Sequence, residues 1–239
     1  MISLTAYAAS DASAPAGPSP VPWAEVLNRY QAANQEQQVR LRDASMEMEI
    51  EARLPRLKKE GSLHALRQIT RLGQISYEAV RTAGDKMVNK DVIARYLAAE
   101  AEASKGIVDS RGRAQSIGLT PDNYKFKPKA VLTTNGRRIY IFQVTPRKSR
   151  LGLFKGEIWV DSGTGMPVRE AGRFVKSPSV FLSNVDFVRE YETIDGLAVP
   201  DKVETRVETR LVGLAELNIR YSNYSFLQTA QAGICALGW

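Results

Sequence analysis

The chain has 239 residues, of which 44% are hydrophobic and 25% charged, a composition typical of a globular protein with one large domain or two small ones. Its length provides a useful core without cross-links. Its single cysteine, Cys235, excludes an intramolecular disulfide, and no apolar run is long enough to span a membrane. The formal charge of +7 is uneven, because residues 125–155 contribute +9 and leave −2 for the remainder.

The N-terminus has some features of an export signal. Residues 1–9 are small and apolar and end in an alanine-rich sequence that suits a signal peptidase, but no basic segment precedes them. They are interpreted either as the end of a signal peptide or as a plain disordered terminus. The following residues, rich in Ser, Ala, Pro and Gly, predict a flexible leader. We expect a periplasmic or secreted protein with a leader over 1–21, a single domain over 22–229 and a tail over 230–239.

The first half of the domain predicts two helices and three strands. Apolar residues at helical spacing follow Pro22, a residue that is tolerated in the first turn of a helix. Methionines and Ile50 then alternate with glutamates, which predicts a half-buried strand with an acidic outer face. Asp85 and Asn89 are both able to cap a second helix, and residues 107–122 predict a loop. The expected elements are a helix over 22–38, strands over 45–51, 63–72 and 75–80, and a helix over 86–104.

From Tyr124 onward the chain predicts a β-meander. Asn135-Gly136 is a strong signal for a type I′ hairpin turn, and Asp195-Gly196 marks another tight turn. Residues 203–211 alternate cleanly between apolar or Thr and charged side chains. Evenly spaced strands and turns indicate an antiparallel sheet or barrel, so the expected fold class is α+β, with a curved antiparallel sheet packed on helices. The predicted strands cover 131–134, 139–144, 151–161, 167–175, 180–193, 203–211 and 214–226.

No pattern in the chain is typical of a catalytic or metal site. His64 is the only histidine, and it lies in a predicted strand without a nucleophile motif nearby, which argues against a Ser–His–Asp triad. One histidine and one cysteine are too few for a zinc cluster, and no glycine-rich phosphate loop is present. The glutamates within 47–51 are explained by a solvated strand face rather than by paired carboxylates for glycoside chemistry. We therefore expect no enzymatic activity and no cofactor.

Residues 125–155 contain nine Lys and Arg and no acidic residue. Such a zone points to an anionic partner, although a solvated face is the simpler explanation. Around the turn expected at 145–150, cations flank apolar residues, a pattern that docks on anionic bilayers. We predict that one group of four cations faces solvent and contacts an anionic surface: Arg147, Lys148, Arg150 and Lys155.

Nucleic-acid binding is the competing interpretation of the same zone. Arg137 and Arg138 precede Tyr140 and Phe142 on a predicted strand, and basic and aromatic side chains together bind single strands. No recognised nucleic-acid-binding motif accompanies them. We therefore expect no nucleic-acid partner.

Several segments of the predicted meander resemble the strands of a known family. They are residues 139–144, 154–161 and Pro167-Val168-Arg169, and the later segments 187–191, 196–200 and 221–224 are similar to the closing strands of the same group. The family is that of the LolA/LolB-like outer-membrane lipoprotein-sorting proteins, and the resemblance covers about residues 124–226. It implies a curved antiparallel sheet, an incomplete barrel closed over by helices, whose concave apolar face holds acyl chains.

The resemblance implies a non-catalytic, periplasmic or exported binding protein. Its ligand would be a lipid, a lipoprotein acyl chain or a similar apolar molecule held between sheet and helices, in a cavity lined in part by Tyr96, Phe142, Trp159 and Phe187. A fully packed core without a cavity is the ordinary alternative for a chain of this size. The alternative function is an envelope regulatory or interaction module that uses the outer surface of the sheet. The ligand, the protein partners and the oligomeric state stay open.

Overall fold

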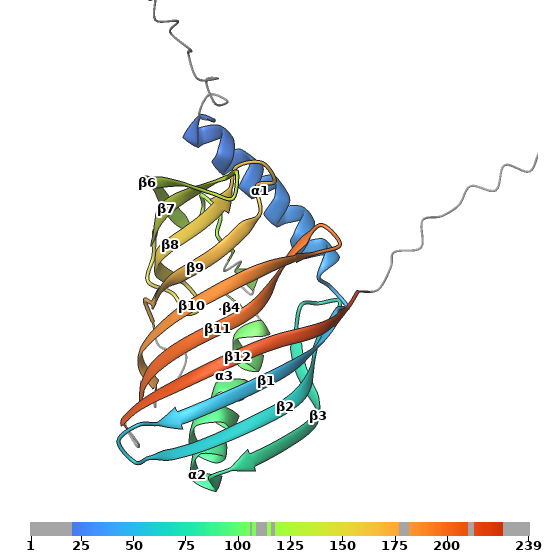
Figure 1. The fold of residues 1–239 in the computed structure, drawn as a ribbon, viewed down its shortest axis with the longest axis vertical. Helices are drawn as coiled ribbons and strands as arrows, with labels where there is room; N and C mark the ends of the chain where they lie inside the picture. The colour runs from blue at the N-terminus through green and yellow to red at the C-terminus, as the bar shows by residue number, and fades with distance from the viewer. Residues whose placement is uncertain are drawn as a thin grey trace, which may run out of the picture.

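In the computed structural model the chain forms one curved antiparallel sheet with helices on one face (Figure 1). The structure describes residues 21–105, 107–108, 114–115, 118–176, 182–209 and 213–226. The expected tail, Cys235 and the expected leader up to residue 20 lie outside these residues. The predicted α+β class and the open, curved sheet packed on helices are confirmed.

The sheet has ten strands in the order β3-β2-β1-β12-β11-β10-β9-β8-β7-β6, each antiparallel to its neighbours. Neighbouring strands are consecutive in the chain except at one place, where the first strand pairs with the last. Among the described residues, β3 and β6 are the free edges, so the barrel is incomplete. The strands are β1 (Ser45–Leu54), β2 (Lys59–Ile69), β3 (Ile75–Gly84), β6 (Tyr124–Thr134), β7 (Arg137–Pro146), β8 (Phe154–Asp161), β9 (Pro167–Phe174), β10 (Leu182–Ile194), β11 (Leu197–Thr209) and β12 (Gly213–Ser225).

The helices lie before the first strand and between β3 and β6. The first is α1 (Trp23–Arg40), and the second is a continuous segment made of α2 (Lys86–Val88), a π-helical turn η1 (Asn89–Ile93) and α3 (Ala94–Ser104). Asp85 caps this second segment, because its side chain accepts hydrogen bonds from the amides of Met87 and Val88 at 2.8 and 3.3 Å. Both predicted helices are thus confirmed.

Two tight turns have the backbone φ angles that their sequences predict. Asn135-Gly136 has φ values of 49° and 73°, and Asp195-Gly196 has values of 51° and 74°. Positive φ at both central residues matches the twist of a hairpin with a two-residue loop. Residues 107–122, predicted as a loop, contain instead the short pair β4 (Ile107–Val108) and β5 (Ala114–Gln115). Strands of two residues are too short to give a recognisable alternation.

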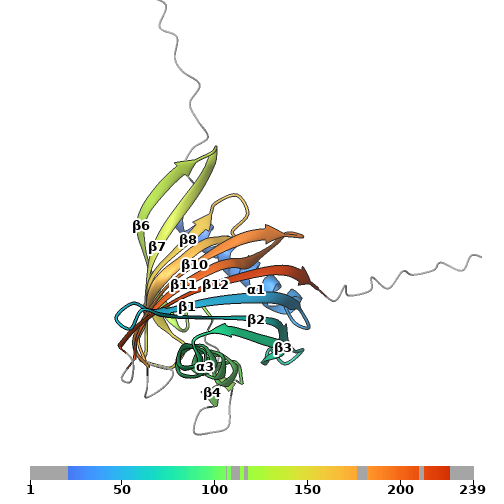
Figure 2. The same cartoon turned by 60° about the horizontal axis from the view of Figure 1, so that its bottom comes forward.

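The inner face of the sheet, which carries the helices, holds two separate hydrophobic clusters. One joins α2 and η1 to β1, β2, β11 and β12, and the other joins α1 to β7 and β8. Figure 2 shows β1–β3 with α3 at one end of the molecule and the β6–β7 hairpin at the other. The space between the two clusters, over β9–β11, therefore lies between two helices rather than beneath one.

Candidate ligand-binding cavity on the inner face

A cavity of about 370 Å³ lies between α1, α3 and the inner face of the sheet. This volume falls within the range of about 300–1,000 Å³ that is usual for small-molecule sites. Its wall is mostly apolar, with a few charged and hydroxyl groups. The apolar and aromatic residues include Leu119, Leu151, Phe154, Phe174, Val185, Phe187, Val203 and Val207, and the polar ones include Tyr30, Tyr96, Glu100, Tyr124, Glu170, Lys176, Arg189, Tyr191 and Thr205.

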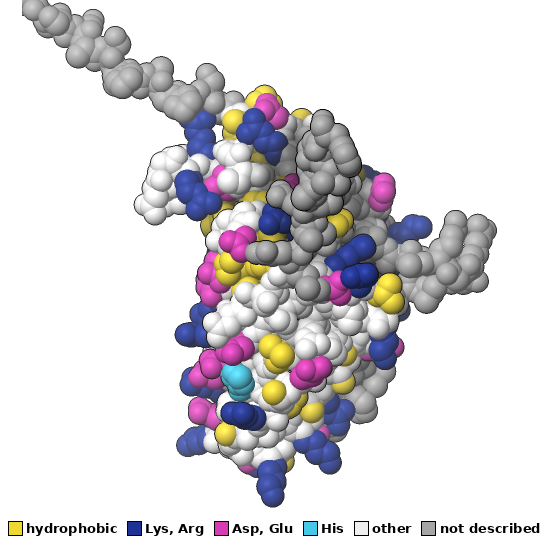
Figure 3. Space-filling view, turned by 90° about the vertical axis from the view of Figure 1, so that its right-hand side faces the viewer, with side chains coloured by type: hydrophobic (Ala, Val, Ile, Leu, Met, Phe, Trp, Pro, Cys, Tyr) yellow, Lys and Arg dark blue, Asp and Glu magenta, His cyan; other side chains and the backbone are white. Residues whose placement is uncertain are grey.

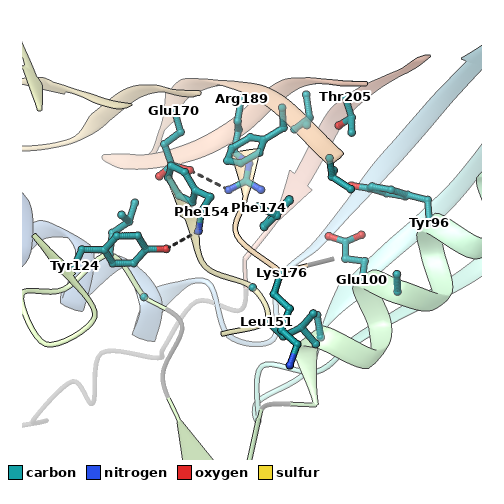
Figure 4. Close-up of a pocket in the computed structure, with 18 of the residues that line it drawn as sticks. Tyr96, Glu100, Tyr124, Leu151, Phe154, Glu170, Phe174, Lys176, Arg189 and Thr205 are labelled. Carbon is teal, nitrogen blue, oxygen red and sulfur yellow. Dashed lines mark hydrogen bonds and ion pairs between the residues drawn. The ribbon is translucent and has the colours of Figure 1, made fainter. Parts of the chain in front are cut away.

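Regular periodicity places these side chains. Alternation along β10 brings Val185, Phe187 and Arg189 to the inner face, because every second residue of a strand faces the same side. On α3, Tyr96 and Glu100 are four residues apart and project together towards the cavity (Figure 4). No side chain of α3 is fully buried, so this helix covers the cavity without filling it.

Arg189 and Glu170 form a charged pair inside the cavity wall. They are directly opposite each other on β10 and β9. Arg189 Nη1 donates to Glu170 Oε2 at 3.1 Å (Figure 4). The same nitrogen donates to the Tyr191 hydroxyl at 3.4 Å. Burial alone would lower the pKa of the guanidinium, but Tyr191 and Glu170 raise that pKa well above its ordinary value. Arg189 is therefore a permanent cation in a mostly apolar wall.

A second charged group attaches α3 to the sheet. Arg67 Nη2 on β2 donates to Glu100 Oε1 at 2.9 Å, and the hydroxyl of Tyr77 on β3 donates to Glu100 Oε2. Burial alone would raise the pKa of Glu100, but Arg67 and Tyr77 hold that pKa below its ordinary value. Glu100 is thus ionised at neutral pH, and its charge is compensated from the sheet.

Several tyrosines are neutral over an unusually wide pH range, and three of them, Tyr30, Tyr96 and Tyr124, line the cavity. Burial raises the pKa of Tyr124 and of Tyr221 to about 12, and burial raises the pKa values of Tyr30, Tyr77 and Tyr96 as well. These hydroxyls therefore remain hydrogen-bond donors in any ordinary buffer.

This predicts a loss of stability at alkaline pH. The phenolate is disfavoured only in the folded state, so the free energy of unfolding should be unaffected below pH about 10, the unperturbed value. It should fall as the pH rises above that value, because the unfolded state then releases protons that the folded state retains. Urea unfolding at several pH values, with tyrosinate absorbance recorded in parallel, measures this. Ionisation of all tyrosines near pH 10 without unfolding would contradict it.

The structure brings two of the four predicted cavity residues together. Tyr96 and Phe187 line the cavity, whereas Phe142 and Trp159 do not. Phe142 lies in the core beneath α1, with its ring 5.2 Å from that of Trp23. Trp159 lies on the outer face, where the guanidinium of Arg169 stacks over it at 5.0 Å. The physical reason is alternation, since the buried Ile158 and Val160 take the inner face of the same strand.

The charged residues of the cavity wall are not among the residues predicted from the sequence, although the sequence contains a signal for one of them. Arg189 stands two residues after Phe187, so period-2 alternation puts both on the same face of β10. Glu170 and Glu100 have no such signal. Their proximity to the cavity depends on strand pairing and on how α3 lies over the sheet.

The four predicted surface cations differ in their surroundings. Arg147, Lys148 and Lys155 are exposed, and Arg150 is half-buried. Arg147 Nε donates to the carbonyl oxygen of Pro121 at 2.6 Å, and Arg150 Nη2 donates to Asn123 Oδ1 at 2.5 Å. These two arginines thus hold the turn before β6, and contact with an anionic surface stays a prediction. Leu153 and Phe154 beside them are both buried.

The structure offers no support for a histidine-based or metal site among the described residues. His64 lies on the outer face with Nε2 3.8 Å from Glu47 Oε2, and Figure 3 shows charges of both signs around this histidine. Within the described residues, no group of three or more His, Cys, Asp or Glu side chains is arranged to hold a metal ion. Helices in the same part of the chain are too short or too polar to cross a membrane.

Comparison with known proteins gives likenesses of structure only. No protein-family model matches the chain, and no curated protein matches it. The solved structures to which it is similar include a LolA superfamily protein from Nitrosomonas europaea, with a TM-score of 0.44 and 9% identity over 86% of this chain and 94% of that one. A putative outer membrane lipoprotein-sorting protein domain from Vibrio parahaemolyticus has a TM-score of 0.43 and 10% identity, over 87% and 93%. A DUF1329 family protein from Desulfovibrio piger has a TM-score of 0.41 and 17% identity, over 86% and 94%.

Proposed function

We propose that this protein is a binding protein that holds an acyl chain, as part of a lipid, a lipoprotein or a similar apolar ligand, in the cavity between α1, α3 and the sheet. The observation that carries this proposal is the cavity itself: about 370 Å³ of space with a mostly apolar wall, in the middle of the inner face. Interiors of proteins are ordinarily close-packed, so a space of this size between two well-packed clusters suits a ligand. Binding requires no covalent step.

The energetics of such a site come from burial of the tail. Each methylene removed from water contributes about 0.8 kcal/mol, so about ten of them contribute about 8 kcal/mol before the cost of association is subtracted. The resemblance to lipoprotein-sorting proteins supports the same ligand class and, as part of the proposal, a periplasmic or exported location.

A substitution that fills the cavity is expected to weaken binding. Ala99 on α3 lines the cavity, whereas its neighbour Ala98 is exposed on the other side of the helix. Ala99→Trp should therefore reduce the affinity for N-phenyl-naphthylamine, a neutral apolar fluorescent probe, at least tenfold, because the indole occupies the space of the ligand. A tenfold loss corresponds to about 1.4 kcal/mol. Fluorescence titration measures the affinity, with dodecanol as the competing ligand.

Ala98→Trp is the matched control, since it adds the same side chain to the same turn of α3 on the solvent side. It is expected to bind the probe as the wild-type protein does. Failure of the wild-type protein to bind the probe or dodecanol would overturn the proposed function. Equal affinities of the two variants would place the probe elsewhere on the protein.

A further inference from the structure

Arg189 uses only part of its hydrogen-bonding capacity. Its side chain is 36% exposed, and Figure 4 shows the guanidinium directed into the cavity. Nη1 makes both of its hydrogen bonds, to Glu170 and to Tyr191. Within the described part of the chain, Nε and Nη2 donate no hydrogen bond. These two nitrogens form one edge of the planar guanidinium fork, the geometry that pairs with a carboxylate or phosphate through two parallel hydrogen bonds.

Both carboxylates of the cavity wall already have a cationic partner. Glu170 is paired with Arg189, and its side chain is only 7% exposed. Glu100 is paired with Arg67. Lys176 also lines the cavity and forms no ion pair within the described residues. Lys176 is exposed, so water solvates its charge, and the free donors of Arg189 are the cationic group of the wall that an anionic ligand group would meet.

Tyr30 supplies an independent indication of a polar ligand group. Its side chain lines the cavity and is only 2% exposed. Its hydroxyl forms no hydrogen bond within the described residues and is not one of their buried polar atoms that lack a partner, so it is open to the cavity. A polar atom of a ligand in the cavity would give this donor a partner.

We propose that the ligand carries an anionic oxygen head, a carboxylate or a phosphate monoester, which pairs with the Nε–Nη2 edge of Arg189 while its acyl tail lies against the apolar wall. This inference rests on the proposed function, because it assigns a head group to the ligand whose tail fills the cavity. A neutral amphiphile of the same length leaves the donors of Arg189 without a strong acceptor. A site built to hydrogen-bond a group discriminates against ligands that lack it.

The test compares amphiphiles that share one tail and differ in the head. Laurate, dodecyl phosphate, dodecanol and dodecylamine each displace bound N-phenyl-naphthylamine from the wild-type protein, and acetate and inorganic phosphate are added in parallel. Laurate or dodecyl phosphate is expected to bind at least tenfold more tightly than dodecanol, and dodecylamine no more tightly than dodecanol. Whichever of the two anions binds better identifies the head as carboxylate or phosphate. Acetate and inorganic phosphate are expected not to displace the probe.

Variants then assign the preference to Arg189. The double variant Arg189→Met with Glu170→Gln removes the pair together, so that no buried carboxylate is left without its partner. It should bind dodecanol as the wild type does and should lose the preference for anions. Lys58→Met, which removes an exposed cation in the turn between β1 and β2, should keep that preference.

The outcomes separate this inference from the proposed function. Displacement by dodecanol and laurate at equal concentrations overturns the head-group inference and leaves the proposed function intact. Displacement by none of the amphiphiles overturns both. If acetate or inorganic phosphate displaces the probe as effectively as laurate does, the inference is also overturned, because the ligand is then a small anion. If the double variant still prefers the anionic amphiphiles, Arg189 does not bind the head group. If the double variant fails to fold, the comparison of amphiphiles on the wild-type protein still determines the chemical class of the head group.

Discussion

Replacing Arg67 with methionine is expected to lower the free energy of unfolding by about 3 kcal/mol or more. The Arg67 and Glu100 side chains are only 11% and 22% exposed, and they are 2.9 Å apart. Methionine keeps the apolar stem but leaves the Glu100 carboxylate with Tyr77 alone. Removing one partner of a buried pair costs about 3–5 kcal/mol, mainly because the other charge remains buried and uncompensated. Urea unfolding followed by circular dichroism measures the loss.

Two further variants test the cause of that loss. Arg67→Met combined with Glu100→Gln removes both charges and should recover most of the stability. Arg206→Met breaks an exposed pair with Glu216 and should cost less than about 1 kcal/mol. The pKa of Glu100 is below its ordinary value in the folded protein, so its pairing contributes fully above the ordinary carboxyl pKa of about 4 and is lost as the pH falls below it. The difference in the free energy of unfolding between wild type and Arg67→Met should therefore become smaller at acid pH. A difference that does not change with pH would show that the loss comes from packing alone.

Replacing Gly156 with alanine is expected to destabilise the sheet by about 3 kcal/mol, near the upper end of the cost of overpacking. Gly156 on β8 lies directly opposite Gly172 on β9. A Cβ atom on Gly156 would lie 2.0 Å from the carbonyl oxygen of Ala171 and 2.5 Å from the Cα atom of Gly172. Both are backbone atoms, so no side-chain rotation relieves the contact, and β8 has to move away from β9. Since Phe154 and Phe174 come from these strands, probe binding in the cavity should weaken as well.

Gly73→Ala is the control for this substitution. Gly73 has φ of +79°, but nothing lies within 4 Å of a Cβ at that position. The cost there is limited to the left-handed conformation, about 1–2 kcal/mol. A loss at Gly156 no larger than that at Gly73, measured by urea unfolding, would mean that the two strands separate easily and that their close approach is not needed for the fold.

The local elements of this fold were predictable because their signals are local. Alternation of Met48 and Ile50 with glutamates predicts β1, and Asn135-Gly136 predicts the turn between β6 and β7. The same alternation, applied to β8, places Trp159 on the outer face and so removes it from the cavity. It also places Arg189 beside Phe187. These inferences need only the pleat of a strand, which is a property of every short segment of chain.

The tertiary structure alone decided where the cavity lies and which charges meet in its wall. The pairing of β1 with β12 joins residues far apart in the chain, such as Ile50 and Ile219, and no local pattern encodes it. Glu170 reaches Arg189 only through the register of β9 on β10, and Glu100 reaches Arg67 only because α3 lies over β2 and β3. The sequence by itself determined which face of each strand is apolar. The space between the two hydrophobic clusters arises from how two helices divide one sheet, because the volume left between packed elements depends on their relative positions and not on the periodicity of any one of them.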